Sequence, residues 1–189
     1  MKHIAVFASG SGTNAENIIK YFKNTKTASV VLVLTNNPKA LVLERAAALE
    51  VKTVVFNKTQ LNDAKWGIDN LADIDLIVLA GFLWKFPEHL LGTYKNKVVN
   101  IHPALLPKYG GKGMYGIHVH KAVKENNENE TGITIHYVNE NYDEGAVIFQ
   151  AKTELNSQDT PETIAEKIHL LEQHHFPKVI EEVILAIHE

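Results

Sequence analysis

The feature that most constrains the fold is an alternation of short apolar runs with helical patterns through the first two-thirds of the chain. The runs are rich in β-branched residues and almost continuously apolar, as strands buried on both faces of a parallel sheet must be. They cover residues 3–7, 30–34, 53–56, 76–79 and 98–101. Residues 14–22 and 41–49 have helical spacing and are expected to pack on the sheet. We therefore predict an α/β fold in one domain over residues 1–189, with a mostly parallel, Rossmann-like sheet and helices on both faces.

The last third of the chain departs from this alternation. After a helix that follows Gly116, segments 132–138 and 146–153 have the composition of two strands joined by a polar connection, which indicates an antiparallel pair. A final helix is expected to begin at Thr160-Pro161, with threonine as the cap and proline in the first helical position. Pro177 lies inside this helix and is expected to kink it or divide it in two.

Composition excludes several classes of protein. The 19 lysines and arginines against 22 acidic residues give a net charge of -3, which disfavours nucleic acid as a partner. The absence of cysteine excludes disulfides, thiolate metal sites and cysteine nucleophiles. No apolar stretch approaches the roughly 20 residues of a membrane span, and the amino terminus lacks the core of a signal peptide. We expect a cytoplasmic protein with small-molecule substrates and neither a nucleic-acid nor a membrane partner.

A glycine-rich segment at residues 9–14 follows the first predicted strand and opens the first helix. The free N–H groups and the dipole at a helix N-terminus attract anions, so this loop indicates phosphate binding. Thr13 and Glu16 also have the spacing of a capping box. Gly10, Gly12 and Ala15 satisfy a relaxed dinucleotide fingerprint, but no acidic residue ends the second strand to hold a ribose. A tight turn without a ligand remains the alternative.

Asn100 and His102 stand two residues apart at the end of an apolar strand, so the period of two directs both side chains to one side. Carboxyl ends of parallel strands are where ligands bind in open sheets. An asparagine amide can donate to a developing oxyanion, and a histidine can exchange a proton near neutral pH, which are the requirements of acyl transfer to an amine. A buried histidine satisfied by hydrogen bonds is the competing interpretation of the pair.

Asp143 lies in the polar connection between the last two predicted strands, where a turn residue is equally common. If this connection returns over the end of the sheet, the Asp143 carboxylate would hold His102 as the imidazolium and raise its pKa. Four other histidines have no convincing partner ligands, so we expect no metal site and place them on the surface: His118, His120, His174 and His175.

Taken together, these residues resemble those of the phosphoribosylglycinamide formyltransferases, over nearly the whole chain. The most specific element is the NIHPALLP block, followed about forty residues later by the block that contains Asp143. The matching segments are SGSGTN at 9–14, LAGFLWKF at 79–86, NIHPALLPKYGG at 100–111, TGITIHYVNENYDEGAVI at 131–148, Glu172, and Phe176-Pro177. The resemblance implies a formyltransferase fold and transfer of a formyl group from 10-formyltetrahydrofolate to the amine of glycinamide ribonucleotide, in purine synthesis.

The resemblance also implies residue roles. The formyl carbon would be surrounded by Asn100, His102 and Asp143. The folate would lie along Leu83, Trp84, Lys85, Phe86 and Asn100. The reaction would require no metal. The ribonucleotide and its phosphate would be held by Gly12, Thr13, Asn14 and Glu172. Two features depart from the family pattern. Lys65 alone offers a basic side chain in segment 61–71 for the folate tail, and segment 112–116 differs from the commonest version.

Other readings stay open on the sequence. Methionyl-tRNA formyltransferases and formyltetrahydrofolate hydrolases share the Asn-x-His and distant aspartate arrangement, but each carries an additional module for which 189 residues leave no room. The acidic charge further disfavours tRNA. A non-catalytic phosphate- or folate-binding module on the same fold is an alternative from another class, because a fold does not fix function. A nicotinamide dehydrogenase is the third.

Overall fold

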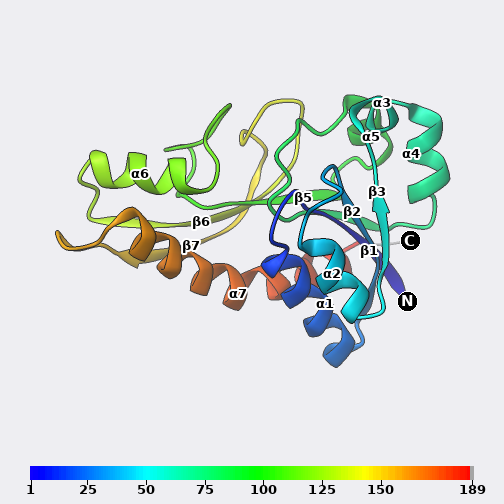
Figure 1. Ribbon diagram of the computed structural model, residues 1–189, viewed down its shortest axis with the longest axis horizontal. Helices are drawn as coiled ribbons and strands as arrows, with labels where there is room; N and C mark the ends of the chain where they lie inside the picture. Colours follow the sequence, from blue (N-terminus) through cyan, green and yellow to red (C-terminus); the bar gives the residue numbers. More distant parts are fainter. Residues whose placement is uncertain (188–189) are drawn as a thin grey trace.

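The computed structural model describes residues 1–187 and is built on one seven-stranded sheet with the strand order β3-β2-β1-β4-β5-β6-β7 (Figure 1). The predicted fold class is confirmed. The strands are β1 (Lys2–Phe7), β2 (Ala28–Thr35), β3 (Lys52–Val55), β4 (Leu76–Leu79), β5 (Val98–His102), β6 (Glu130–Tyr137) and β7 (Val147–Glu154).

The first five strands pair in parallel, and β6 and β7 extend the sheet in antiparallel register, as the last third of the sequence indicates. The strand order reverses between β1 and β4, which are neighbours in the sheet although two strands separate them in sequence. Ligands bind outside the carboxyl ends of the strands at such a reversal. The loops that follow β1 and β4 are joined there by the Ser9 N–H, which donates to the Gly81 carbonyl over 3.0 Å.

Helices cover both faces of the sheet because successive strand residues point to opposite sides. In β1, Ile4 and Val6 belong to one buried cluster and Ala5 and Phe7 to the other. The first cluster includes side chains of α1 (Thr13–Thr25), α2 (Val42–Ala48), α6 (Ile117–Glu125) and α7 (Pro161–Leu185). The second includes side chains of α3 (Lys58–Leu61), α4 (Ala64–Leu71) and α5 (Glu88–Thr93). None of the helices within residues 1–187 is both long and apolar enough to cross a membrane.

The first helix begins differently from the predicted capping box. Gly12 is the N-cap, in the left-handed region at φ 74°, and no side chain caps the helix. Thr13 is therefore the first helical residue, and Glu16 bonds instead to Lys20 and Arg45. A glycine is needed here because the chain must turn sharply from β1 into α1. The first N–H groups of α1 consequently have no side-chain partner.

The last helix runs unbroken from Pro161 to Leu185, so of the two outcomes expected at Pro177, a kink or a division, the division is wrong. Thr160 caps its start as predicted, accepting a hydrogen bond from the Thr163 N–H. Pro177 has no N–H, so the carbonyl of Gln173 one turn earlier loses its helical partner. That carbonyl accepts instead from the side-chain amide of Asn17 in α1, over 2.8 Å. The contact between α1 and α7 thus supplies the hydrogen bond that the proline removes.

Candidate active site

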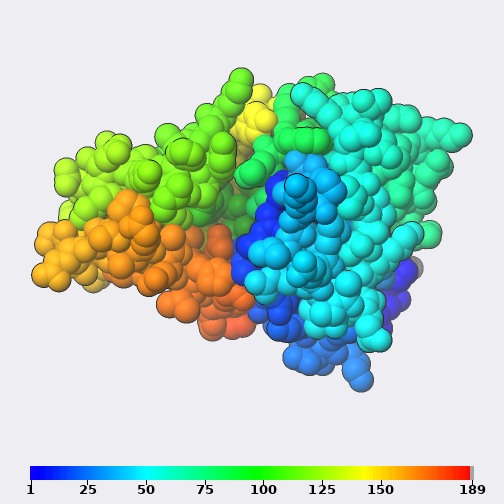
Figure 2. All heavy atoms as spheres, in the orientation of Figure 1, coloured from blue at the N-terminus to red at the C-terminus, as the bar shows by residue number. Residues whose placement is uncertain are grey.

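A cavity of about 960 Å³ lies at the carboxyl ends of the central strands. Its walls include segments 9–14, 79–86, 100–103 and 111–117, with further residues from the β6–β7 connection and from α7. Figure 2 shows the hollow between the side built from α6 and α7 and the side built from α1 and α2. This volume is at the upper end of small-molecule sites and is large enough for two ligands in contact.

The end of β5 brings Asn100 and His102 to this cavity, and both line it. His102 is only 3% exposed. Its Nε2 donates to the backbone carbonyl of Tyr109 over 2.7 Å, which fixes one ring nitrogen as protonated. The tight turn after β5 therefore orients the imidazole before any substrate binds.

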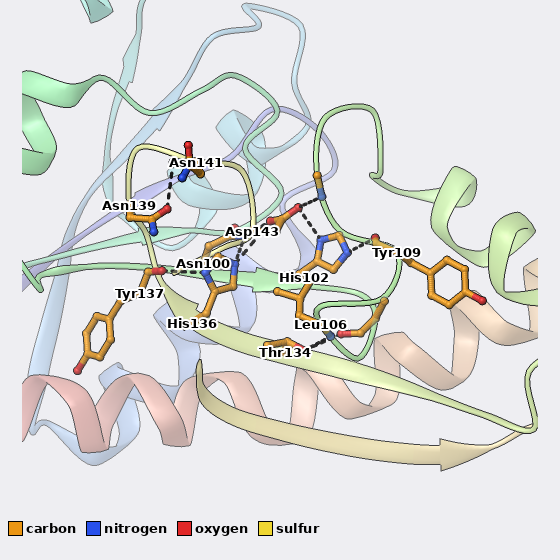
Figure 3. Close-up of polar contacts among 12 residues, drawn as sticks. Asn100, His102, Leu106, Tyr109, Thr134, His136, Tyr137, Asn139, Asn141 and Asp143 are labelled. Carbon is orange, nitrogen blue, oxygen red and sulfur yellow. Dashed lines mark hydrogen bonds and ion pairs between the residues drawn. The ribbon is translucent and has the colours of Figure 1, made fainter. Parts of the chain in front are cut away.

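Asp143 is carried to His102 by the connection between β6 and β7, which folds back over the end of the sheet (Figure 3). Its Oδ2 lies 3.5 Å from His102 Nδ1 and accepts the N–H of Gly111 over 3.0 Å. The backbone of Asp143 is left-handed, at φ 57°, a conformation that aspartate tolerates better than most residues. The structure thus brings together the three residues that the sequence proposes as a catalytic centre.

A fourth residue, His136, belongs to this group and was missed by the sequence reasoning. It lies directly opposite Asn100 in the β5–β6 pairing and is 2% exposed. Its Nδ1 donates to the Tyr137 carbonyl over 2.8 Å, which leaves Nε2 to accept from the Asn100 amide over 3.1 Å. Asp143 Oδ1 lies 3.6 Å from the same ring nitrogen. His136 therefore fixes which way the Asn100 amide points. His136 reaches the site through the register of β6 against β5, and the sequence carries no direct signal of that register.

The electrostatics of His102 differ from the expectation. Burial lowers its pKa below the ordinary value, and the Asp143 charge and the Tyr109 carbonyl only partly offset this. The predicted net rise of the pKa is therefore wrong, because the cost of placing a charge in a buried position exceeds the attraction of one carboxylate at 3.5 Å. The direction of the Asp143 effect is as expected.

Asp143 itself is held as a carboxylate. Burial would raise its pKa, but the neighbouring His136 ring, the charge of His102 and the N–H of Gly111 together lower it. An ionised carboxylate next to a neutral imidazole is a pair ready to receive a proton at His102 Nδ1. Protonation there would turn the 3.5 Å approach into a charge-assisted hydrogen bond.

The glycine-rich loop forms another wall of the cavity, and it is tied to α7. Gly12, Thr13, Asn14 and Glu172 all line the cavity. The Asn14 amide donates to the Glu172 carboxylate over 2.9 Å and accepts from Gln173 over 3.1 Å. The four residues proposed to hold the ribonucleotide are therefore neighbours, although they come from opposite ends of the chain.

The segment that follows β4 forms the more apolar wall. Leu83, Trp84, Lys85 and Phe86 all line the cavity. Phe86 is buried, with its ring 5.4 Å from that of Phe7, so it supports the cavity wall from behind and exposes little surface to the cavity. The Leu83 N–H donates to the Ser9 hydroxyl over 3.0 Å, and Lys85 pairs with Glu88 over 3.3 Å.

The two histidines near the start of α6 have different environments. His120 is buried and lines the cavity, so its placement on the surface is wrong, whereas His118 is exposed as expected. Two positions along a helix point to different sides, so the side of α6 that packs on α7 carries His120 and the outer side carries His118.

Residues 112–116 form part of the cavity wall, and Lys65 does not line it. Among residues 1–187, no group of three or more histidine, cysteine, aspartate or glutamate side chains is arranged to hold a metal ion.

Comparison with known proteins agrees with this geometry. Residues 2–180 match the formyl transferase family model. The chain is 38% identical to phosphoribosylglycinamide formyltransferase of Bacillus subtilis, covering 97% of this chain and 95% of that one, and 38% identical to the chloroplastic enzyme of Arabidopsis thaliana, of which it spans 66%. The crystal structure of glycinamide ribonucleotide transformylase 1 from Geobacillus kaustophilus superposes with a TM-score of 0.88 at 36% identity, covering 97% of this chain and 99% of that one. The chain therefore belongs to the formyl transferase family.

Proposed function

We propose that this protein transfers the formyl group of 10-formyltetrahydrofolate to the amine of 5-phosphoribosylglycinamide. The observation that carries the proposal is the grouping of Asn100, His102 and Asp143 in one cavity, between a glycine-rich wall at the start of α1 and an apolar wall. Solved and curated relatives of nearly the same length carry the name of this activity. No cysteine is present, which excludes a cysteine-bound formyl intermediate, and direct attack by the amine is the simplest reaction.

The phosphate of the ribonucleotide would bind at the start of α1. The first N–H groups of this helix have no side-chain cap and face the region where the helix dipole is positive. Gly12 allows close approach of the backbone, and Asn14 lies beside Glu172. A carboxylate such as that of Glu172 is suited to accept hydrogen bonds from ribose hydroxyls. These groups support a phosphorylated sugar as one substrate.

The formyl folate would lie along Leu83, Trp84, Lys85 and Phe86. Trp84 and Phe82 pack with Phe56, edge-on and tilted, in the cluster on the other face of the sheet, which gives this wall an aromatic lining. Such a lining favours a planar heterocycle by stacking and by burial of apolar surface. The two substrates would thus meet at β5 from the two sides of the sheet edge.

In the proposed reaction, the neutral substrate amine attacks the formyl carbon and forms a tetrahedral intermediate. Asn100 would donate to its oxyanion, since the 3.5 Å contact of its amide nitrogen with Asp143 is long and readily replaced. The Nε2–H of His102 would leave the Tyr109 carbonyl and donate to the same oxyanion, and Asp143 would stabilise the imidazolium form of His102. The carbon–nitrogen bond to the folate then breaks, and the proton lost by the attacking amine passes to the folate nitrogen through His102 or a water held by Asp143.

The test is a spectrophotometric assay of folate deformylation with purified protein, glycinamide ribonucleotide and 10-formyltetrahydrofolate. We expect folate loss to require the ribonucleotide, with one formylated product for each folate consumed. Folate loss without the ribonucleotide would replace the proposal with hydrolysis, and binding of both ligands without turnover would replace it with a non-catalytic module. In the same assay His102→Ala should lower turnover by about a hundredfold or more.

A further inference from the structure

One buried polar side chain in the cavity has no place in the reaction described above. His120 lies near the start of α6, where this helix packs on α7, and is 5% exposed while lining the cavity. Its neighbour Val119 is fully buried and His118 points to solvent. The His120 ring is therefore fixed between the protein interior and the substrate site.

Within residues 1–187, neither nitrogen of the His120 ring is hydrogen-bonded. Nδ1 is sealed from solvent and has no partner among the groups of residues 1–187. Nδ1 is enclosed by the protein, so the nitrogen whose hydrogen bond a ligand in the cavity can supply is Nε2, which has no partner among residues 1–187 either. Because Nδ1 is the enclosed nitrogen and the residue lines the cavity, Nε2 is the nitrogen that opens onto it.

The charges around His120 indicate which substrate it faces. Burial lowers its pKa, the Glu172 carboxylate opposes this effect, and the nearby His102 adds to it. Glu172 is bonded to Asn14 of the glycine-rich loop. Neighbouring α6 residues Val119 and Val123 pack in the cluster on one face of the sheet, and Phe82 and Trp84 pack in the cluster on the other face. His120 therefore lies on the side of the cavity near Glu172, away from the aromatic wall. The ring stays neutral, since an imidazolium would place a second N–H at Nδ1 with no acceptor.

We propose that His120 is a further substrate-binding residue, whose Nε2 forms a hydrogen bond with a hydroxyl or carbonyl oxygen of the ribonucleotide. This inference rests on the proposed function, and it adds a contact that α6 supplies. A neutral imidazole suits the position because the substrate amine binds nearby and must lose any positive charge before it attacks. A cationic group at this position would oppose binding of the protonated amine.

Two substitutions separate the ring nitrogens. His120→Gln places an amide near the position of Nε2, whereas His120→Asn places it near the enclosed Nδ1. We expect His120→Asn to raise KM for the ribonucleotide about five- to tenfold, the loss of one neutral hydrogen bond, with KM for the folate unchanged. His120→Gln should stay within about threefold of the parent protein. His118→Gln, on the exposed side of the same helix, is the matched control and should leave both constants unchanged.

Calorimetric titration with glycinamide ribonucleotide alone keeps this test independent of turnover. If the parent protein binds the ribonucleotide but does not transfer the formyl group, the proposed function fails while the Kd values of the variants still decide the role of His120. Equal ribonucleotide affinity in His120→Asn and the parent would overturn the inference, as would equal losses for both substrates. Absence of ribonucleotide binding in the parent would overturn both. Thermal unfolding of each variant checks that the fold is retained.

Discussion

The Oδ2 atom of Asp143 lies 3.5 Å from Nδ1 of His102, although the two residues come from separate connections at the end of the sheet. This approach is too long for a strong hydrogen bond, and burial keeps the pKa of the His102 imidazole below its ordinary value. The same approach becomes favourable once His102 gains a proton. In the proposed mechanism the pair is thus arranged for the charged intermediate, which is the condition for lowering a reaction barrier.

Asp143→Asn tests this arrangement directly. Asparagine has nearly the same size and also tolerates the left-handed backbone at φ 57°, so the fold should be kept. Without the carboxylate, the imidazolium of His102 loses its partner, and turnover should fall by about a hundredfold or more. Steady-state kinetics give the measurement. Asp69→Asn, on an exposed position of α4, is the matched control and should retain normal turnover. Comparable activity in the two variants would remove Asp143 from the proposed mechanism.

The titration of the His102 ring gives a second prediction. Burial lowers its pKa and Asp143 raises it, so the NMR midpoint of His102 should lie below the ordinary value of about 6.5, and Asp143→Asn should displace it further downward. The unfolded chain keeps the ordinary value and so binds more protons in the interval between the two pKa values. The free energy of unfolding should therefore fall as the pH drops through this interval. A midpoint above about 6.5 would contradict the dominance of burial.

The turn from β1 into α1 provides a prediction about stability. Gly12 has φ 74°, and a Cβ added there would lie 2.4 Å from Val42 Cγ2 and 2.7 Å from the Val42 Cα. Gly12→Ala should therefore lower the free energy of unfolding by about 2 to 4 kcal/mol, from backbone strain and overpacking together. Urea denaturation measures the change. Gly10→Ala is the control, because nothing lies within 4 Å of its added Cβ, and a loss as large as that of Gly12→Ala would refute the steric explanation.

Short-range periodicity in the sequence predicted much of this protein. Continuous apolar runs identified the parallel strands, and the spacing of Asn100 and His102 placed them on one side of β5 at the end where ligands bind. The Thr160-Pro161 pair located the start of the last helix. These features are local, because strand pleat and helix capping depend on residues a few positions apart.

Tertiary structure decided what depends on distant partners. His136 joined the site only through its register opposite Asn100, and Asp143 only through the fold of its connection back to Gly111. The packing of α6 on α7 buried His120, and the Asn17 side chain let α7 continue past Pro177. The lowered pKa of His102 also depends on tertiary structure, because the cost of burying a charge depends on every atom that excludes water from it. Pattern along the chain decided which residue types could meet at the end of the sheet, and long-range packing decided which of them lie together there and in what charge state.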